Sequence, residues 1–346
     1  MLKTVESVTE GHPDKVCDQV ADAVLDEFLR RDPQSRVAVE AFGSHGVLIV
    51  GGEVTSAAEV DVERLARSVY AQIGYREDID VLVHLERQSP DIAQGVDPGG
   101  AGDQGIMYGY ATTETPELMP LPVTLAHALT RRLADLRRHD PLFAWLGPDG
   151  KAQVTMDRGR LLSVVVSTQH DPDISQEEIR LLLRESLLEP LLGDLHGVET
   201  LINPTGRFVT GGFAADTGLT GRKLMVDTYG GLIPHGGGAF SGKDPTKVDR
   251  SAAYMARFAA KNLVAGGLAK NAFVSVAYAI GRAEPLMLSA KSGDGKDLSA
   301  EVARRFDFRP AAIIERFDLR RPIYRQTASG GHFGKPGLPW EEVIAL

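Results

Sequence analysis

The chain has 346 residues, of which 43% are hydrophobic and 25% charged, a composition typical of a globular protein with two or three domains. The formal net charge is -9, from 38 Lys and Arg against 47 Asp and Glu, which argues against nucleic acid as the main partner. No run approaches the ~20 apolar residues of a membrane helix. A single cysteine, Cys17, excludes an internal disulfide and a multi-cysteine zinc site. With no secretory signal recognisable in residues 1–10, these features favour a cytoplasmic protein.

The first third of the chain has the pattern of an α+β unit. Pro13 suits the first turn of a helix, and apolar residues then recur at helical spacing as far as Phe28. Alternation and spacing predict further strands and one helix, namely strands over 36–42, 47–54 and 81–85 and a helix over 60–73.

The same order of elements recurs twice after a glycine-dense segment, 94–109, which we predict to be an irregular loop. The second stretch predicts helices over 123–139 and 176–192 and strands over 152–157, 161–168 and from 201. The third predicts strands over 223–227, 273–280 and 285–290, a glycine-rich loop over 230–242, and helices over 248–264, 300–305 and 311–317. The pattern therefore predicts three α+β units of similar size, divided as 1–92, 93–210 and 211–346.

The segment 231–250, GLIPHGGGAFSGKDPTKVDR, is the richest in candidate ligand residues. Its glycines let backbone N–H groups approach a ligand closely, as phosphate-binding loops require. Five cations lie in or just before it, at Arg222, Lys223, Lys243, Lys247 and Arg250, with carboxylates at Asp216, Asp244 and Asp249. This combination suits a polyphosphate held with a divalent metal, although a solvated loop before a charged helix is an alternative.

Two motifs in this segment are incomplete. Residues 237–243 fit G-x-x-x-x-G-K, but Asp244 stands where a P-loop has the Ser or Thr that holds Mg²⁺. Residues 235–238 read HGGG, the oxyanion-hole string of some esterases, but the chain has no G-x-S-x-G nucleophile elbow.

Two shorter segments are also candidates. Residues 11–15, GHPDK, place an imidazole, a carboxylate and an ammonium at a helix start, where the helix dipole favours anions. Residues 100–105, GAGDQG, suit a mobile lid or an ordinary domain connection.

Taken together, these segments resemble the S-adenosylmethionine synthetase (methionine adenosyltransferase) family of bacteria and eukaryotes, almost from end to end. The matching strings are EGHPDK (10–15), QSPDIAQGVD (88–97), GAGDQG (100–105), STQH (167–170), NPTGRF (203–208), GLTGRK (218–223), DTYGG (227–231) and GGGAFSGKDPTKVDRSAAY (236–254).

The resemblance implies a role for each matching residue. His12 is similar to the residue beside the C5′–O5′ bond and the triphosphate, Asp14 and Asp249 to the ligands of a pair of Mg²⁺ ions, and Glu40 to a K⁺ ligand. For methionine the matching residues are Glu53, Gln88 and Lys247, and Asp216 is similar to the residue that touches both substrates. For ATP they are Asp149 and Lys151 at the adenosine, Arg207 and Phe208 at the base, and Arg222, Lys223, Ala239 and Lys243 at the polyphosphate.

The resemblance also implies three βαββαβ-like domains in a pseudo-threefold arrangement and active sites between two subunits of a homodimer or homotetramer. The implied reaction joins methionine to the adenosyl group of ATP, and the released triphosphate is hydrolysed to phosphate and diphosphate. A methionine-independent Mg²⁺-dependent NTPase and a non-catalytic regulatory homologue are the alternatives.

Departures from the family pattern lie around the expected gating loop, 95–105. Only Pro98 and Gly99 separate Asp97 from Gly100, where many relatives carry a longer loop, and 75–87 is also shorter than usual. Cys17 matches no catalytic cysteine, so we expect it to be a packing residue.

Overall fold

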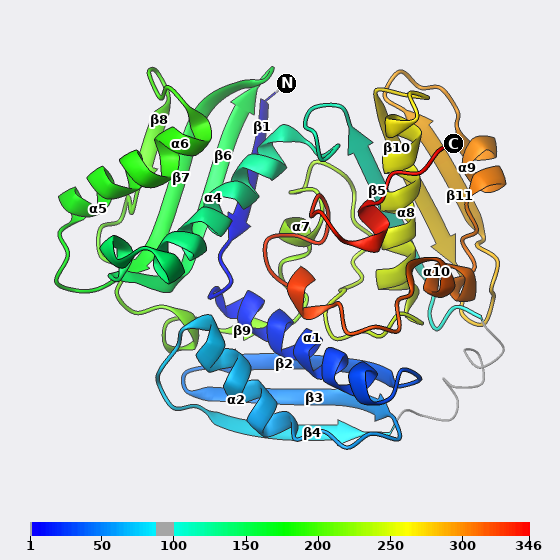
Figure 1. Ribbon diagram of the computed structural model, residues 1–346, viewed down its shortest axis with the longest axis horizontal. Coiled ribbons are helices and arrows are strands. Elements are labelled where there is room, and N and C mark those ends of the chain that lie inside the picture. Colours follow the sequence, from blue (N-terminus) through cyan, green and yellow to red (C-terminus); the bar gives the residue numbers. More distant parts are fainter. Residues whose placement is uncertain (1, 88–99) are drawn as a thin grey trace.

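The computed structural model describes residues 2–87 and 100–346. Three β-sheets surround a central region that contains the short helix α7 (Leu224–Asp227), and each sheet carries helices on one face (Figure 1). The predicted α+β class with three similar units is confirmed. No helix within the described ranges is long and apolar enough to cross a bilayer.

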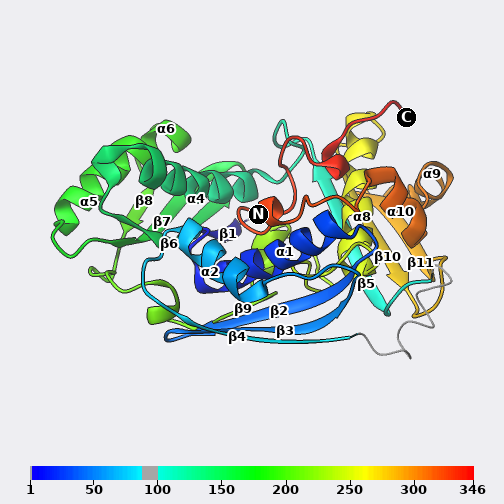
Figure 2. The same cartoon turned by 60° about the horizontal axis from the view of Figure 1, so that its bottom comes forward.

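Sheet I has the strand order β9-β2-β3-β4. Its strands are β9 (Gly218–Leu219), β2 (Arg36–Ser44), β3 (Val47–Thr55) and β4 (Asp80–Glu86). Strands β2 and β3 form an antiparallel hairpin, and β4 runs parallel to β3. Helices α1 (Pro13–Arg31) and α2 (Val62–Ile73) cover one face, and Figure 2 shows no helix of the described chain on the other.

Sheet II repeats this plan with the order β1-β6-β7-β8. Its strands are β1 (Leu2–Val8), β6 (Leu146–Asp157), β7 (Arg160–His170) and β8 (Glu199–Ile202). Strands β6 and β7 form the hairpin, and β8 runs parallel to β7. The helices of this unit are α4 (Leu121–His139), α5 (Gln176–Leu183) and α6 (Glu189–Leu192), the last two joined by a π-helical turn.

Sheet III has three antiparallel strands, β5 (Gly105–Thr112), β10 (Asn271–Tyr278) and β11 (Met287–Ser292). The long helix α8 (Val248–Ala265) packs on β5 and β10, and α9 (Ser299–Arg305) and α10 (Pro310–Phe317) follow.

In every sheet the hairpin pairs with one strand that comes from a distant part of the chain. Strand β1 precedes α1 but pairs with β6, β5 precedes α4 but pairs with β10, and β9 precedes α8 but pairs with β2. Each of the predicted segments 1–92, 93–210 and 211–346 thus gives its first strand to the sheet of another segment. The boundaries themselves stay a prediction.

Two local predictions are wrong. Residues 224–227, expected in a strand, form the helical turn α7. Strand β5 begins at Gly105, inside the predicted irregular loop. Gly109 explains the second error, because a Cβ there would lie 2.0 Å from the carbonyl carbon of Ala256 in α8. This glycine therefore allows close approach between a strand and a helix.

Candidate active site

The first group of predicted site residues lies at the N-terminus of α1. His12 is the N-cap, and its Nδ1 accepts the Asp14 N–H at 3.1 Å. The Asp14 carboxylate accepts the Leu219 N–H at 3.0 Å and a bond from Lys223 Nζ at 2.6 Å. Arg222 Nε lies 3.5 Å from the same carboxylate. The helix start and the turn after β9 therefore form one charged cluster.

Burial controls the ionisation of this cluster. Burial, with the positive charges of Lys223 and Lys151, lowers the pKa of His12 to about 3, so its imidazole is neutral near pH 7. Burial acts to raise the pKa of Asp14, but the bonds from Lys223 and Leu219 outweigh it and hold that pKa below its usual value. A neutral imidazole thus lies beside an ionised carboxylate.

Asp149 in β6 carries one bonded and one unbonded carboxylate oxygen. Its Oδ2 accepts the Gly212 N–H at 2.9 Å. Its Oδ1 is buried and has no hydrogen-bond partner among the residues that the structure describes. Burial raises the pKa of this carboxyl to about 6. Lys151 and Asp216 are exposed, and both act electrostatically on His12.

The predicted base-binding residues adjoin this position. Arg207 is exposed and Phe208 is half-buried. His170 fixes the Phe208 backbone, since its Nε2 accepts the Phe208 N–H at 3.0 Å. The Gln169 amide joins this segment to Asp149, accepting the Asp149 N–H at 3.3 Å and donating to a carbonyl oxygen, that of Val209, at 3.1 Å.

The second group lines a cavity of about 430 Å³ on the face of sheet I that no helix of the described chain covers. Glu40 and Glu53 come from β2 and β3, and Ala239 and Lys243 from the glycine-rich loop. Lys243 Nζ lies 2.6 Å from the Asp249 carboxylate in the first turn of α8. Lys243 and two glutamates thus line this cavity, and Asp249 is reached through its ion pair with Lys243.

Lys247 pairs with a carboxylate outside this cavity. It is the N-cap of α8, and its Nζ lies 2.6 Å from the Asp244 carboxylate. The side chains of Lys223, Lys243 and Lys247 are 18%, 23% and 19% exposed, so ligands can reach these ammonium groups.

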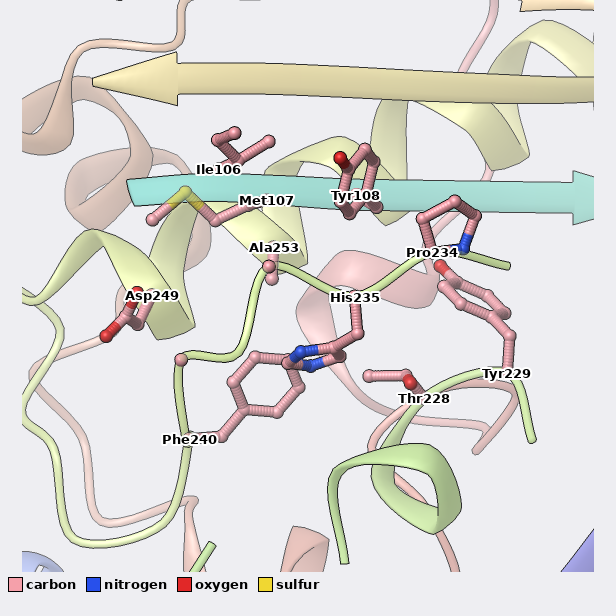
Figure 3. A pocket seen from close by; sticks show the side chains of 12 residues that line it. Ile106, Met107, Tyr108, Thr228, Tyr229, Pro234, His235, Phe240, Asp249 and Ala253 are labelled. Carbon is pink, nitrogen blue, oxygen red and sulfur yellow. The ribbon is translucent and has the colours of Figure 1, made fainter. Parts of the chain in front are cut away.

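The glycine-rich loop itself packs tightly against β5 and α8, as Figure 3 shows. The cavity between them measures about 10 Å³, which is room for one water at most. The rings of His235 and Phe240 lie with centroids 6.0 Å apart. A Cβ on Gly236 would lie 1.7 Å from the backbone carbonyl oxygen of Ile106 in β5, so that position requires glycine. The HGGG string is therefore explained by packing.

Comparisons with known proteins identify the family. Three family models match, described as the N-terminal, central and C-terminal domains of S-adenosylmethionine synthetase, over residues 1–90, 98–208 and 210–342. The chain belongs to the S-adenosylmethionine synthetase family. It is similar to the S-adenosylmethionine synthases of Thermus thermophilus (52% identity, 99% of this chain and 96% of the relative), Kosmotoga olearia (52%, 100% and 97%) and Deinococcus radiodurans (50%, 98% and 95%).

The alignments with these relatives are longer than the chain itself. They span 380, 382 and 387 positions, more than the 346 residues of this chain, so these family members carry segments that this chain lacks. Gln88 and residues 95–99 of the expected gating loop lie outside the described residues. Within its described part, Ala101 exchanges backbone hydrogen bonds with Arg282 and Gly281, which attaches the approach to β5 to the turn after β10.

Two cations and one carboxylate from the candidate segments are buried in internal ion pairs. The Lys15 ammonium is fully buried between the carboxylates of Asp18 and Asp227. Arg250 is equally buried, and its two Nη atoms lie 2.7 and 2.8 Å from the Asp22 carboxylate. Asp244 is buried as well and accepts the Val37 N–H at 2.7 Å. Burial removes all three from direct ligand contact.

Asp18 and Asp22 of α1 were not predicted as site residues. Both side chains are fully buried, and both bind backbone N–H groups in the site loops. A signal was present, because Asp14, Asp18, Asp22 and Asp26 recur at four-residue spacing. Like charges at that spacing destabilise an isolated helix, so the pattern predicts partners outside α1.

The donor atoms suit Mg²⁺ only when a ligand completes the site. No group of three or more metal-binding side chains occurs within residues 2–87 and 100–346. Asp14 and Asp249 are separate carboxylates, each paired with a lysine. Because Mg²⁺ is commonly bound by one or two carboxylates plus substrate phosphates, this arrangement fits a metal that arrives with a polyphosphate.

Proposed function

We propose that this chain transfers the adenosyl group of ATP to methionine. The methionine sulfur forms a bond to C5′, the C5′–O5′ bond breaks, and triphosphate leaves with the electron pair and is then hydrolysed to phosphate and diphosphate. The observation that carries the proposal is a set of accessible cations: Arg222 and Lys223 lie beside Asp14, Lys243 beside Asp249, and Lys247 beside the buried Asp244.

The chemistry needs this kind of site. A thioether is neutral and already nucleophilic, so no base has to deprotonate it. The main tasks are to align sulfur with C5′, which can supply ~7–11 kcal/mol, and to stabilise the charge on the leaving triphosphate. Arg222, Lys223 and Lys243 offset the negative charge on the triphosphate, and the neutral imidazole of His12 can donate a hydrogen bond to an oxygen of the leaving group.

For the remaining roles we propose the assignments that the resemblance implies. The free Oδ1 of Asp149, with Lys151, Arg207 and Phe208, binds the adenosine. Asp216 contacts both substrates. Arg222, Lys223, Ala239 and Lys243 bind the polyphosphate, and methionine is bound by Glu53, Gln88 and Lys247.

Asp14 and Asp249 would hold a pair of Mg²⁺ ions, and Glu40, exposed on β2, would hold K⁺. When bound, Mg²⁺ neutralises charge on the phosphate oxygens. Lys223 and Lys243 occupy the carboxylates at 2.6 Å in this structure, and we propose that they turn to the polyphosphate when it binds with the metal.

We also propose that the chain self-associates through sheet I. Its uncovered face carries an apolar row in register across the four strands, Leu219, Phe42, Ile49 and Leu82. Phe42, Ile49 and Leu82 are 39%, 37% and 56% exposed. A second copy on this face would bury the row and would close the cavity that Glu40 and Glu53 line.

A matched pair of variants tests this interface. Ile49→Lys should lower the molecular mass measured by sedimentation and abolish the transfer activity. Leu201→Lys, at an equally exposed position (37%) on sheet II, should change neither. Equal masses for the two variants would contradict the interface.

The activity itself is tested by product analysis. Purified protein is incubated with ATP, methionine, Mg²⁺ and K⁺, and a parallel reaction omits methionine. We expect S-adenosylmethionine with matching phosphate and diphosphate, and only in the complete reaction. Phosphate release that does not depend on methionine would indicate an NTPase, and no turnover would indicate a non-catalytic homologue.

A further inference from the structure

One stripe of carboxylates follows the length of α1. Asp14, Asp18, Asp22 and Asp26 are four residues apart, and at 3.6 residues per turn they stay close to one face of the helix. Each carboxylate accepts a hydrogen bond from the backbone of a later segment. The N–H donors are those of Leu219 (3.0 Å), Gly221 (2.9 Å), Gly242 (2.8 Å), and Tyr324 and Arg325 (both 2.9 Å).

The two middle carboxylates hold the turns that carry the site cations. Gly221, bound by Asp18, directly precedes Arg222 and Lys223, and Gly242, bound by Asp22, directly precedes Lys243. Both glycines have positive φ, +80° and +79°. The two turns also meet, because a Cβ on Gly221 would lie 2.5 Å from the Cβ of Ala239. Arg222, Lys223 and Lys243 therefore follow glycines whose N–H groups are held by carboxylates of α1.

Both carboxylate oxygens of Asp18 accept hydrogen bonds. One oxygen accepts the Gly221 N–H, and the other accepts a bond from Lys15 Nζ at 2.9 Å. Lys15 also binds Asp227 at the end of α7, the helix that follows Lys223. The segment between Gly221 and Asp227 is thus tied to α1 at both ends.

We propose that Asp18 and Asp22 are positioning residues that set where Lys223 and Lys243 meet the polyphosphate. The inference rests on the proposed function, since it assumes that these lysines bind phosphate. Asp18 itself cannot touch the ligand, because its side chain is fully buried.

The substitution Asp18→Asn tests the role with little change in shape. An asparagine can accept the Gly221 N–H or face the Lys15 ammonium with its oxygen, but its amide nitrogen is a donor, so one of the two bonds is lost. Asp26→Asn is the matched control. It makes the same change on the same stripe and also loses one of two bonds, but those bonds hold residues 324–325, which carry no proposed ligand.

The probe is inorganic triphosphate with Mg²⁺, and the readouts are its dissociation constant by calorimetry and the thermal midpoint without ligand. Both variants should lower the midpoint. Asp18→Asn should weaken triphosphate binding about tenfold or more, the effect of losing a hydrogen bond to a charged group. Asp26→Asn should bind triphosphate within about twofold of the unchanged protein, because distant sites act independently.

Other outcomes would overturn the proposal. Equal triphosphate affinities in Asp18→Asn and Asp26→Asn would show that Asp18 only stabilises the fold. If Asp18→Asn does not fold, Asp18→Glu keeps the charge beside Lys15 but moves the Gly221 turn by one methylene. Unchanged triphosphate affinity in Asp18→Glu would then reject the role. An unchanged protein that binds no triphosphate would overturn the proposed function and the positioning role with it.

Discussion

The glycine-rich segment carries two kinds of cation that differ in burial and partners. Arg250 is fully buried, holds Asp22 with two hydrogen bonds and bonds the Tyr254 hydroxyl at 2.9 Å. Lys243 is 23% exposed, and its ammonium bonds Asp249 alone among the described residues. Lys15 and Lys223 differ in the same way, because Lys15 is fully buried between two carboxylates whereas Lys223 is 18% exposed. Residue type alone therefore does not identify a ligand-binding cation.

Burial explains why the two kinds serve different purposes. A buried charge loses its hydration and is tolerated only with paired, hydrogen-bonded partners, so removing one partner leaves an uncompensated charge. A partly exposed ammonium with a single carboxylate can exchange that carboxylate for a phosphate at little cost. The buried pairs are thus expected to stabilise the fold, and the accessible cations to bind the ligand.

Removing a buried cation should have the largest effect on stability. Arg250→Met leaves the Asp22 carboxylate buried and unpaired, and we expect the free energy of unfolding to fall by about 3–5 kcal/mol. Urea unfolding measures the change. A loss below about 1 kcal/mol, the size of a surface pair, would contradict the division between the two kinds of cation.

Removing an accessible cation should affect activity instead. Lys243→Met is expected to lower kcat by about 10²–10³, as the loss of one group that stabilises transition-state charge does. Its free energy of unfolding should change by less than about 1 kcal/mol. Lys3→Met, at an exposed lysine paired with Glu114, is the control and should leave both quantities unchanged.

A smaller effect is expected from the partner of Lys243. Asp249→Asn removes one carboxylate charge, so the Mg²⁺ concentration for half-maximal activity should rise about tenfold. A magnesium titration of the transfer reaction measures it. An unchanged titration curve would remove Asp249 from the proposed metal ligands.

Surface ion pairs should matter least. Glu27 bonds Arg30 and Arg31, which lower its pKa to about 2. Since the folded pKa is depressed, this stability is present above the unfolded pKa near 4.5 and is lost as pH falls toward 2. Both arginines are largely exposed, so Glu27→Gln should cost under about 1 kcal/mol at pH 7 and nothing near pH 2. Urea unfolding at the two pH values checks this, and a loss that persists near pH 2 would contradict it.

Local sequence pattern predicted most helices and hairpins, because amphipathic periodicity is written in neighbouring residues. It did not predict that β1, β5 and β9 pair outside their own segments, since strand pairing depends on residues more than a hundred positions away. Short elements failed for a related reason. The hydrogen bonds from Lys223 and Gly221 to α1 hold the turn before α7 and oppose the expected strand.

The candidate site shows the same limit. The matching strings predicted a set of site residues that includes His12, Asp14, Lys223, Lys243 and Asp249. In the structure these five residues lie in two clusters, which β9 and the glycine-rich loop join. Residue type could not distinguish buried from accessible cations, so Lys15 and Arg250 were counted with the candidate phosphate ligands although both are buried in ion pairs. Their partners, Asp18 and Asp22, are not marked by any of the strings, and only the fold shows the pairing.

Lysine footprinting tests the division between buried and accessible cations most directly. Native protein is treated with an amine-reactive reagent, with and without Mg²⁺ and inorganic triphosphate, and modification is read by mass spectrometry. We expect Lys15 to stay unmodified throughout, and Lys223 and Lys243 to react in the free protein and become protected by triphosphate. Lys3 should react equally in both. Modification of Lys15 in the native protein, or labelling of Lys243 that triphosphate does not reduce, would contradict the account.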